Sequence, residues 1–357
     1  MKDPFPIAPI PALSKAVQPW ADWLSLPTLP LHIHEVLIIA AFYHFIHVVV
    51  APIVSNWVFP VQYKNLSATK KLNWDVHVVS FVQSTTINAL ALWVMFTDDE
   101  RWNMDAQERV YGYTGAIAMI QALAAGYFLW DLIITVSNMH IFGLGMLAHA
   151  ISALLVYSFG FRPFVNYYST TFILWELSSP FLNVHWFCDK LGLTGSKVQL
   201  YNGIALIATF FSCRLVWGTY NSYRVFCDVW GAMQTKPSYI PLTSDVAQNL
   251  TVPARYESTM RFVTESSAVP LWLGALYLGA NLTLNSLNFY WFVKMIQAVQ
   301  KRFDPSQQKD EAAEEKKPGS DGSAATTALD LQTGLKSRPR RGTILDGEDG
   351  DQPPPGI

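Results

Sequence analysis

Residues 112–136 read GYTGAIAMIQALAAGYFLWDLIITV, and this stretch decides the fold. Its single charged side chain is Asp131, and a helix needs about 20 mostly apolar residues to cross a bilayer. The rest of the chain has the same character: 51% of its 357 residues are hydrophobic and 15% are charged. Soluble domains carry roughly 25% charged residues. We therefore predict an all-α, multi-pass transmembrane helical bundle.

Seven stretches meet the same criterion of length and composition. They are 36–56, 76–96, 112–136, 141–160, 164–187, 198–220 and 268–293. Tryptophans lie near the ends of these stretches, where amphipathic rings prefer to rest at a membrane interface. The alternative, seven buried helices of a soluble protein, would need polar faces that these segments lack.

The predicted spans divide the chain into four parts. We expect an N-terminal segment at 1–35, an extra transmembrane helix at 36–59 and a domain of six spans at 71–300, which contains a longer loop at 221–267. Residues 304–357 have almost no aromatic side chains. Such a segment cannot bury enough apolar surface to offset the entropy of ordering it, so we predict a disordered tail.

Charge and cysteine content exclude several classes of function. The net charge of −2 provides no basic field for nucleic acid, and the three cysteines form no paired spacing. His44 and His47 share a helix face, but two histidines are too few to indicate a metal site, and packing is the preferred interpretation. We predict no metal and no cofactor.

Lysines indicate the orientation in the membrane. The connection at 60–75 and the flank after 300 are both basic and lie on the same side of seven spans, which the positive-inside rule makes cytosolic. The C-terminus would then be cytosolic, and Asn249 would be the lumenal glycosylation acceptor. Thr343 follows two arginines and resembles a kinase site, although a plain solvated tail is the simpler interpretation.

Ionisable side chains inside a membrane are costly and therefore indicate function. On neighbouring antiparallel spans, Asp131 and His149 fall at one depth, together with Gln83. A carboxylate beside an imidazole could raise its basicity for proton transfer. A structural Asp–His pair that joins two helices is the alternative. Arg214 is predicted to extend to the interface.

Two further patterns predict surfaces that line a cavity. Gly145 and Ser152 share a small, polar helix face with His149, and such faces pack against helices or cavities rather than lipid. Pro180 deprives the carbonyl of Glu176 of its helical partner, so we predict a kinked, cavity-lining segment. Ser179 and Asn183 lie on the same face as Glu176, and a purely structural kink is the alternative.

These residues resemble the TLC-domain family, which includes ceramide synthases, over 73–300. The resemblance is carried by Asn73-Trp74-Asp75, Gly126-Tyr127-Phe128-Leu129-Trp130-Asp131, His149, Glu176-Leu177-Ser178-Ser179-Pro180-Phe181-Leu182-Asn183, and Arg214 to Gly218. It implies six membrane helices around a cavity, a lipid-related function and a location in the endoplasmic reticulum or linked endomembranes.

In ceramide synthases, adjacent histidines support acyl transfer from acyl-CoA to a sphingoid amine. Here Ala150 occupies the second histidine position, and Gln83 stands where relatives often carry a histidine. The resemblance therefore implies a small TLC branch that binds or senses membrane lipids, of sphingoid or acyl-CoA type. A lipid N-acyltransferase that uses Asp131 and His149 is the second hypothesis, and a trafficking adaptor is the third.

Overall fold

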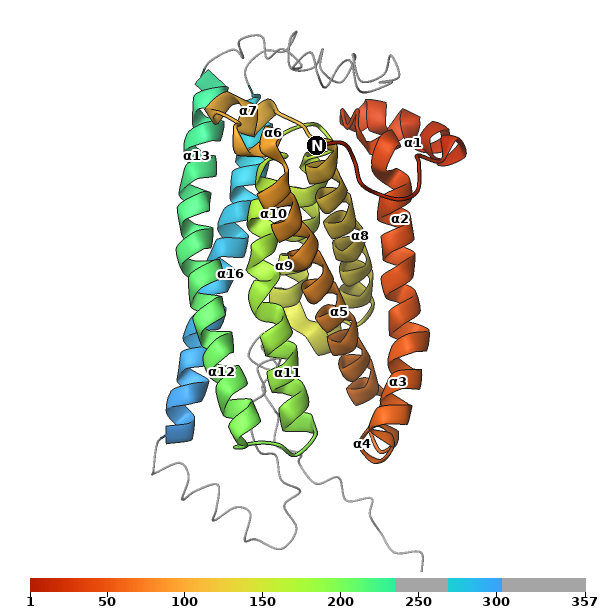
Figure 1. The fold of residues 1–357 in the computed structure, drawn as a ribbon, viewed down its shortest axis with the longest axis vertical. Coiled ribbons are helices and arrows are strands. Elements are labelled where there is room, and N and C mark those ends of the chain that lie inside the picture. Colours follow the sequence, from red (N-terminus) through yellow and green to blue (C-terminus); the bar gives the residue numbers. More distant parts are fainter. Residues whose placement is uncertain (235–268, 304–357) are drawn as a thin grey trace, which may run out of the picture.

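The computed structural model describes residues 1–234 and 269–303, which form an elongated bundle of helices (Figure 1). Five helical stretches in this part are long and apolar enough to cross a membrane. They are Leu29–Val58, Ala68–Thr97, Gly115–Ser137, Met139–Phe159 and Lys197–Gln234. The broken segment from Tyr168 to Lys190 and the long helix Leu271–Phe303 also run along the bundle. The predicted all-α, multi-pass architecture is confirmed.

Most of these stretches contain more than one helical element. The first half of the chain contains α1 (Pro11–Leu24), α2 (Leu29–Phe45), the π-helix η1 (Ile46–Val50), α3 (Ala51–Val58), α4 (Pro60–Lys64), α5 (Ala68–Thr97), α6 (Asp99–Trp102), α7 (Ala106–Tyr111), α8 (Gly115–Ser137) and α9 (Met139–Phe159). The second half contains α10 (Tyr168–Phe172), the 3₁₀-helix η2 (Ile173–Ser178), α11 (Ser179–Lys190), α12 (Lys197–Phe210), the π-helix η3 (Phe211–Trp217), α13 (Gly218–Gln234) and α16 (Leu271–Phe303).

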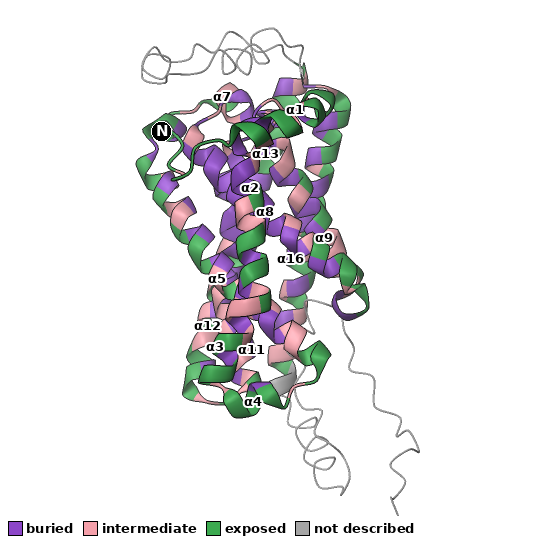
Figure 2. Cartoon of the chain, turned by 90° about the vertical axis from the view of Figure 1, so that its right-hand side faces the viewer, coloured by how far each residue is buried: buried purple, intermediate pink, exposed green. Residues whose placement is uncertain are grey.

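In Figure 1, α1, α6 and α7 lie at the upper end of the bundle, whereas α4 and the turn between α11 and α12 lie at the lower end. α1 lies across the upper end and is mostly exposed (Figure 2). Its outward side chains include Trp20 and Trp23, which are 63% and 75% exposed. Aromatic rings of this kind suit a membrane interface.

α8 is the most enclosed of the five candidate spans, with 83% of its most apolar window buried. Small residues allow its neighbours to approach closely. A Cβ atom at Gly126 would lie 2.6 Å from the carbonyl oxygen of Val36 on α2, so the two backbones are in contact there. Membrane helices usually pack by close approach at small residues. Lipid tails are as apolar as the side chains, so the hydrophobic effect contributes little to packing between the helices.

The first span begins at Leu29, seven residues before the predicted start at 36. His32, His34 and Glu35, which the sequence analysis placed in the N-terminal segment at 1–35, thus belong to this span. All three are buried, and His32 and Glu35 contact each other while His34 contacts the carbonyl oxygen of Ile7. These contacts offset part of the free-energy cost of burying the three polar side chains.

The loop predicted at 221–267 is wrong in its first part, because α13 continues the helix to Gln234. Val225, Val229 and Ala232 form a buried stripe at helical spacing, and α13 packs against α7 and α16. Asp228 accepts hydrogen bonds from Arg109 at 2.7 and 2.9 Å. Asp228, a charged residue inside the predicted loop, therefore binds a side chain of the neighbouring helix α7. The rest of that loop and the tail at 304–357 lie outside the described residues.

Candidate functional site

The predicted break near Pro180 positions one wall of an interior site. α10 gives way to the 3₁₀-helix η2, and α11 starts at Ser179 with Pro180 in its first turn. A proline is tolerated there because the first helical N–H groups have no partner in any case. The Ser179 hydroxyl donates to Glu176 Oε2 at 2.7 Å, so both side chains lie on the inner side of the break.

Arg214 is held inside the bundle, not at the interface as the sequence predicted. It is 2% exposed, and one guanidinium nitrogen lies 3.5 Å from Glu176 Oε1. The same group donates to the oxygens of Ser178 at 3.0 Å, Ser179 at 3.1 Å and Asn288 at 3.0 Å. The prediction failed because this helix runs on to Gln234, which leaves Arg214 near its middle rather than at its end.

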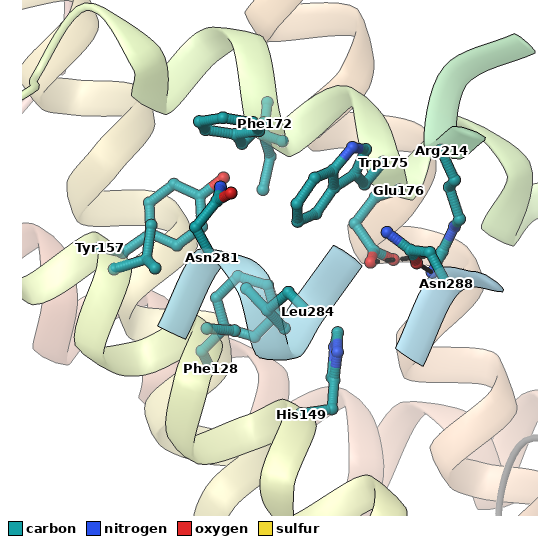
Figure 3. Close-up of a pocket in the computed structure, with 13 residues that line it drawn as sticks. Phe128, His149, Tyr157, Phe172, Trp175, Glu176, Arg214, Asn281, Leu284 and Asn288 are labelled. Carbon is teal, nitrogen blue, oxygen red and sulfur yellow. Dashed lines mark hydrogen bonds and ion pairs between the residues drawn. The ribbon is translucent and has the colours of Figure 1, made fainter. Parts of the chain in front are cut away.

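Two adjoining cavities lie next to this cluster, and His149 and Glu176 line both. The first encloses about 430 Å³, and aromatic rings form much of its wall (Figure 3). Its lining residues are Phe128, His149, Ala153, Val156, Tyr157, Phe172, Ile173, Trp175, Glu176, Arg214, Asn281, Leu284 and Asn288. This half is mainly apolar.

The second cavity encloses about 650 Å³ and is more polar. Its lining residues are Val76, His77, Ser80, Tyr127, Asp131, Ile134, Thr135, Phe142, Met146, His149, Glu176, Ser179, Leu182 and Asn183. The two linings together come from α5, α8, α9, the α10–α11 segment, η3 and α16, and none of these residues belongs to α2. Six helical segments thus surround the cavities, while α2 packs outside them.

His77 forms a wall of the polar cavity together with α11. Its Nδ1 lies 2.6 Å from Asn183 Oδ1, and its ring stacks on Trp186 with centroids 3.9 Å apart. Asn183 also donates to Ser80 Oγ at 3.1 Å. These contacts leave the His77 ring little freedom to rotate.

Several buried polar atoms in the linings have no hydrogen-bond partner among the described residues. They are His77 Nε2, His149 Nδ1, Trp175 Nε1, both amide atoms of Asn281, and Asn288 Nδ2. Buried polar groups in folded proteins are almost always paired, and leaving one unpaired costs about 1–3 kcal/mol. The cavities therefore offer donors and acceptors to a bound molecule.

The structure brings together most of the predicted site residues. Asp131, His149, Glu176, Ser179 and Asn183 all line the polar cavity. Asp131 and His149 come from the neighbouring helices α8 and α9. Asn249 and Thr343 lie outside the described residues.

Four predicted lining residues, Gln83, Gly145, Ser152 and Pro180, line neither cavity. The lining face of α9 follows Met146, His149 and Ala153, about a quarter of a turn away from Gly145 and Ser152. Gln83 is buried nearly a turn beyond Ser80, the last lining residue on α5. Pro180 is next to Ser179 in the chain, so its side chain leaves the helix in a different direction.

His77, Asn281 and Asn288 were not predicted as site residues. His77 falls at the i−3 position from Ser80, so helical periodicity through Asn73, Val76 and Ser80 is the signal that could have identified it. Asn281 and Asn288 lie seven residues apart on one face of α16, but only the packed bundle shows that this face points inward.

Fold and site together define a polytopic α-helical membrane protein with a polar and aromatic interior cavity. The family model TRAM_LAG1_CLN8, described as the TLC domain, matches residues 73–297. The chain belongs to the TLC-domain family.

Relatives extend this assignment over most of the chain. An uncharacterized TLC domain-containing protein of Schizosaccharomyces pombe is 37% identical over 298 residues, which cover 84% of this chain and 89% of the relative. Topoisomerase I damage affected protein 4 of Saccharomyces cerevisiae is 27% identical over 77% of this chain and 87% of its own length. Human TLC domain-containing protein 4 is 31% identical over 43% of this chain and 58% of its own length. No solved structure matches the chain significantly.

Proposed function

We propose that the protein binds a membrane lipid in its two adjoining cavities and thereby senses or adjusts membrane lipid composition. The observation that carries this proposal is the set of unpartnered polar atoms on His77, His149, Asn281 and Asn288, which line the two cavities. Satisfying them by a bound head group would recover the free energy lost when they were buried.

The shape of the site suits an amphipathic ligand. A lipid head group would lie against Asp131, His77 and Asn183, and an acyl chain would extend toward Phe128, Phe172 and Trp175. Ligand sites are typically concave and mainly apolar, with a few polar groups that fix the orientation of the ligand. The Arg214–Glu176 pair neutralises its own charge, which favours a head group that hydrogen-bonds, such as that of a sphingoid lipid.

We further propose that the lower end of the bundle faces the cytosol. The connections at this end carry Lys64, Lys70, Lys71, Lys190 and Lys197. The upper end also carries Lys2, Lys15, Arg101 and Arg109, but Arg101 is bound by Thr170 and Thr171 and Arg109 is paired with Asp228. The positive-inside rule then makes the side on which α16 ends cytosolic, and with it the C-terminus. The endoplasmic reticulum or linked endomembranes is the proposed location, which the family suggests.

Mass spectrometry of lipids released from detergent-purified protein tests lipid binding. Ala153→Phe would fill the space beside His149, whereas Ile151→Phe adds the same ring on the same helix at a position 42% exposed. We expect a defined lipid class with the native protein and the Ile151→Phe control, and at least a tenfold smaller yield with Ala153→Phe. Equal yields from both variants would refute binding in the cavity.

Acyl transfer is a second candidate, because Asp131, His149 and His77 line one cavity and supply a carboxylate and two imidazoles. In this reaction, one imidazole would take the proton of a lipid amine as the amine attacks the acyl-CoA thioester, and CoA would leave as the thiol. Purified protein with acyl-CoA and a sphingoid amine tests it. Turnover that His149→Ala abolishes, with lipid binding retained, would favour the enzyme over the sensor.

A further inference from the structure

A second polar cluster lies at the upper end of the bundle, on the outer helix α2, and contributes no residue to the lipid cavities. Asp3, His32 and Glu35 each direct a ligand atom toward the others, and these atoms all lie within 4.8 Å of one another. His32 Nδ1 is 2.6 Å from Glu35 Oε1 and 3.4 Å from Asp3 Oδ2. His32 and Glu35 are 1% and 0% exposed.

The hydrogen bond at His32 Nε2 determines whether Nδ1 faces the two carboxylates as a donor or as an acceptor. His32 Nε2 lies 2.6 Å from the Tyr113 hydroxyl. If Nε2 carries the proton and donates to that oxygen, Nδ1 presents its lone pair to two carboxylates. Glu35 Oε2 is buried and has no hydrogen-bond partner among the described residues. Three acceptors then converge, and they need protons or a cation between them.

The two carboxylates also oppose each other's charge. Their nearest oxygens lie within 4.8 Å of each other, beside the His32 ring. Two ionised carboxylates at this spacing in a poorly solvated place are unfavourable unless a positive charge joins them. A divalent ion bound by all three side chains would supply that charge.

Packing of the N-terminal segment holds Asp3 over α2. The backbone nitrogen of Asp3 lies so close to Gly115 that a Cβ there would be 2.2 Å away. The Met1 carbonyl oxygen accepts a hydrogen bond from the Ala116 N–H at 3.3 Å. Asp3 is thus positioned by the start of α8, and the cluster joins three separate parts of the chain.

We propose that Asp3, His32 and Glu35 bind a divalent transition-metal ion, with Zn²⁺ as the best match. One imidazole nitrogen and two carboxylate oxygens are usual zinc ligands, and three protein ligands leave a fourth position for water. Bonds of about 2.1 Å in a tetrahedral site place ligand atoms roughly 3.4 Å apart, so the site needs adjustments of about 1 Å. Tyr113 fixes the orientation of the ligating ring. The bound ion fastens the N-terminal segment to α2.

Untagged, full-length protein in detergent, stripped with EDTA and titrated with ZnCl₂, tests the proposal. We expect one zinc per chain by elemental mass spectrometry and a higher thermal unfolding midpoint with zinc. Asp3→Asn and Glu35→Gln should weaken zinc binding at least tenfold. Asp3 is partly exposed, so its variant keeps the test valid if the buried Glu35→Gln variant fails to fold.

His140→Gln is the matched control, because it removes an exposed imidazole at the start of α9 that belongs to no such cluster among the described residues. We expect it to bind zinc as the native protein does. No zinc binding by the folded native protein, or unchanged binding by Asp3→Asn and Glu35→Gln, would overturn the proposal and favour protons shared between the carboxylates.

Discussion

Arg214 and Glu176 form an ion pair inside the bundle, with 3.5 Å between the guanidinium nitrogen and Oε1. The pair joins η3 to η2, two of the places where regular α-helix is interrupted beside the cavities. A buried pair is a poor source of net stability, but an unpaired buried charge is costly. The pair therefore serves to hold two irregular helices in one arrangement.

We predict that Arg214→Gln destabilises the protein by about 3–5 kcal/mol, because Glu176 would then be a buried carboxylate without its cation. Thermal unfolding in detergent measures this change. The double variant Arg214→Gln, Glu176→Gln should be more stable than Arg214→Gln alone. If the double variant is no more stable, the ion pair is not what couples these positions.

A second prediction concerns Asn183, which holds His77 and Ser80 at the wall of the polar cavity. Asn183→Ala removes these hydrogen bonds and frees the His77 ring. Each lost hydrogen bond is worth about 0.5–1.5 kcal/mol. A loss of this size in the free energy of binding corresponds to several-fold weaker lipid binding, which is the result that we expect. Lipid retained per mole of protein is the measurement. Asn56→Ala is the control, because Asn56 is exposed and bonds only to its own helix.

A third prediction tests the contact between α2 and α8. Gly126→Ala places a Cβ 2.6 Å from the Val36 carbonyl oxygen, so the two helices must separate. Overpacking of this kind costs about 1–3 kcal/mol. Gly279→Ala is the matched control, since a Cβ there meets no atom within 4 Å and alanine favours a helix. Unfolding midpoints should fall for the first variant and stay level or rise for the second.

A fourth prediction concerns the pair Arg109–Asp228, which ties α7 to the end of α13. The hydrogen bond to Asp228 raises the pKa of Arg109, so the arginine stays charged at any working pH. Asp228→Asn should cost about 1–2 kcal/mol, at the low side for charged hydrogen bonds because the pair is only partly buried. Thermal unfolding measures it, with the exposed Asp99→Asn expected to have little effect. An equal loss in both variants would argue against a specific pair.

Most of the fold could be predicted from local sequence. Long apolar runs such as 112–136 can be stable only in lipid or in a core, so they predicted the spans directly. Boundaries failed before residue 36 and after residue 220, where the structure continues the helix through Glu35 and Asp228. Glu35 contacts His32 one turn away, and Asp228 pairs with Arg109 far away in the chain, and composition alone shows neither contact.

The sequence by itself determined that this chain is a helical membrane protein of the TLC family, and that Asp131, His149 and Glu176 belong to its interior. Lipid as the solvent forces backbone groups into helices and forces ionisable groups inward, and both effects act on each segment alone. Only the tertiary structure decided that Arg214 pairs with Glu176, that His77 joins the cavity wall and that Asp3 meets His32 and Glu35. Those contacts depend on how each helix is rotated about its own axis relative to its neighbours. A difference of two or three positions along a helix moves a side chain from the face that lines the cavity to the face that points outward.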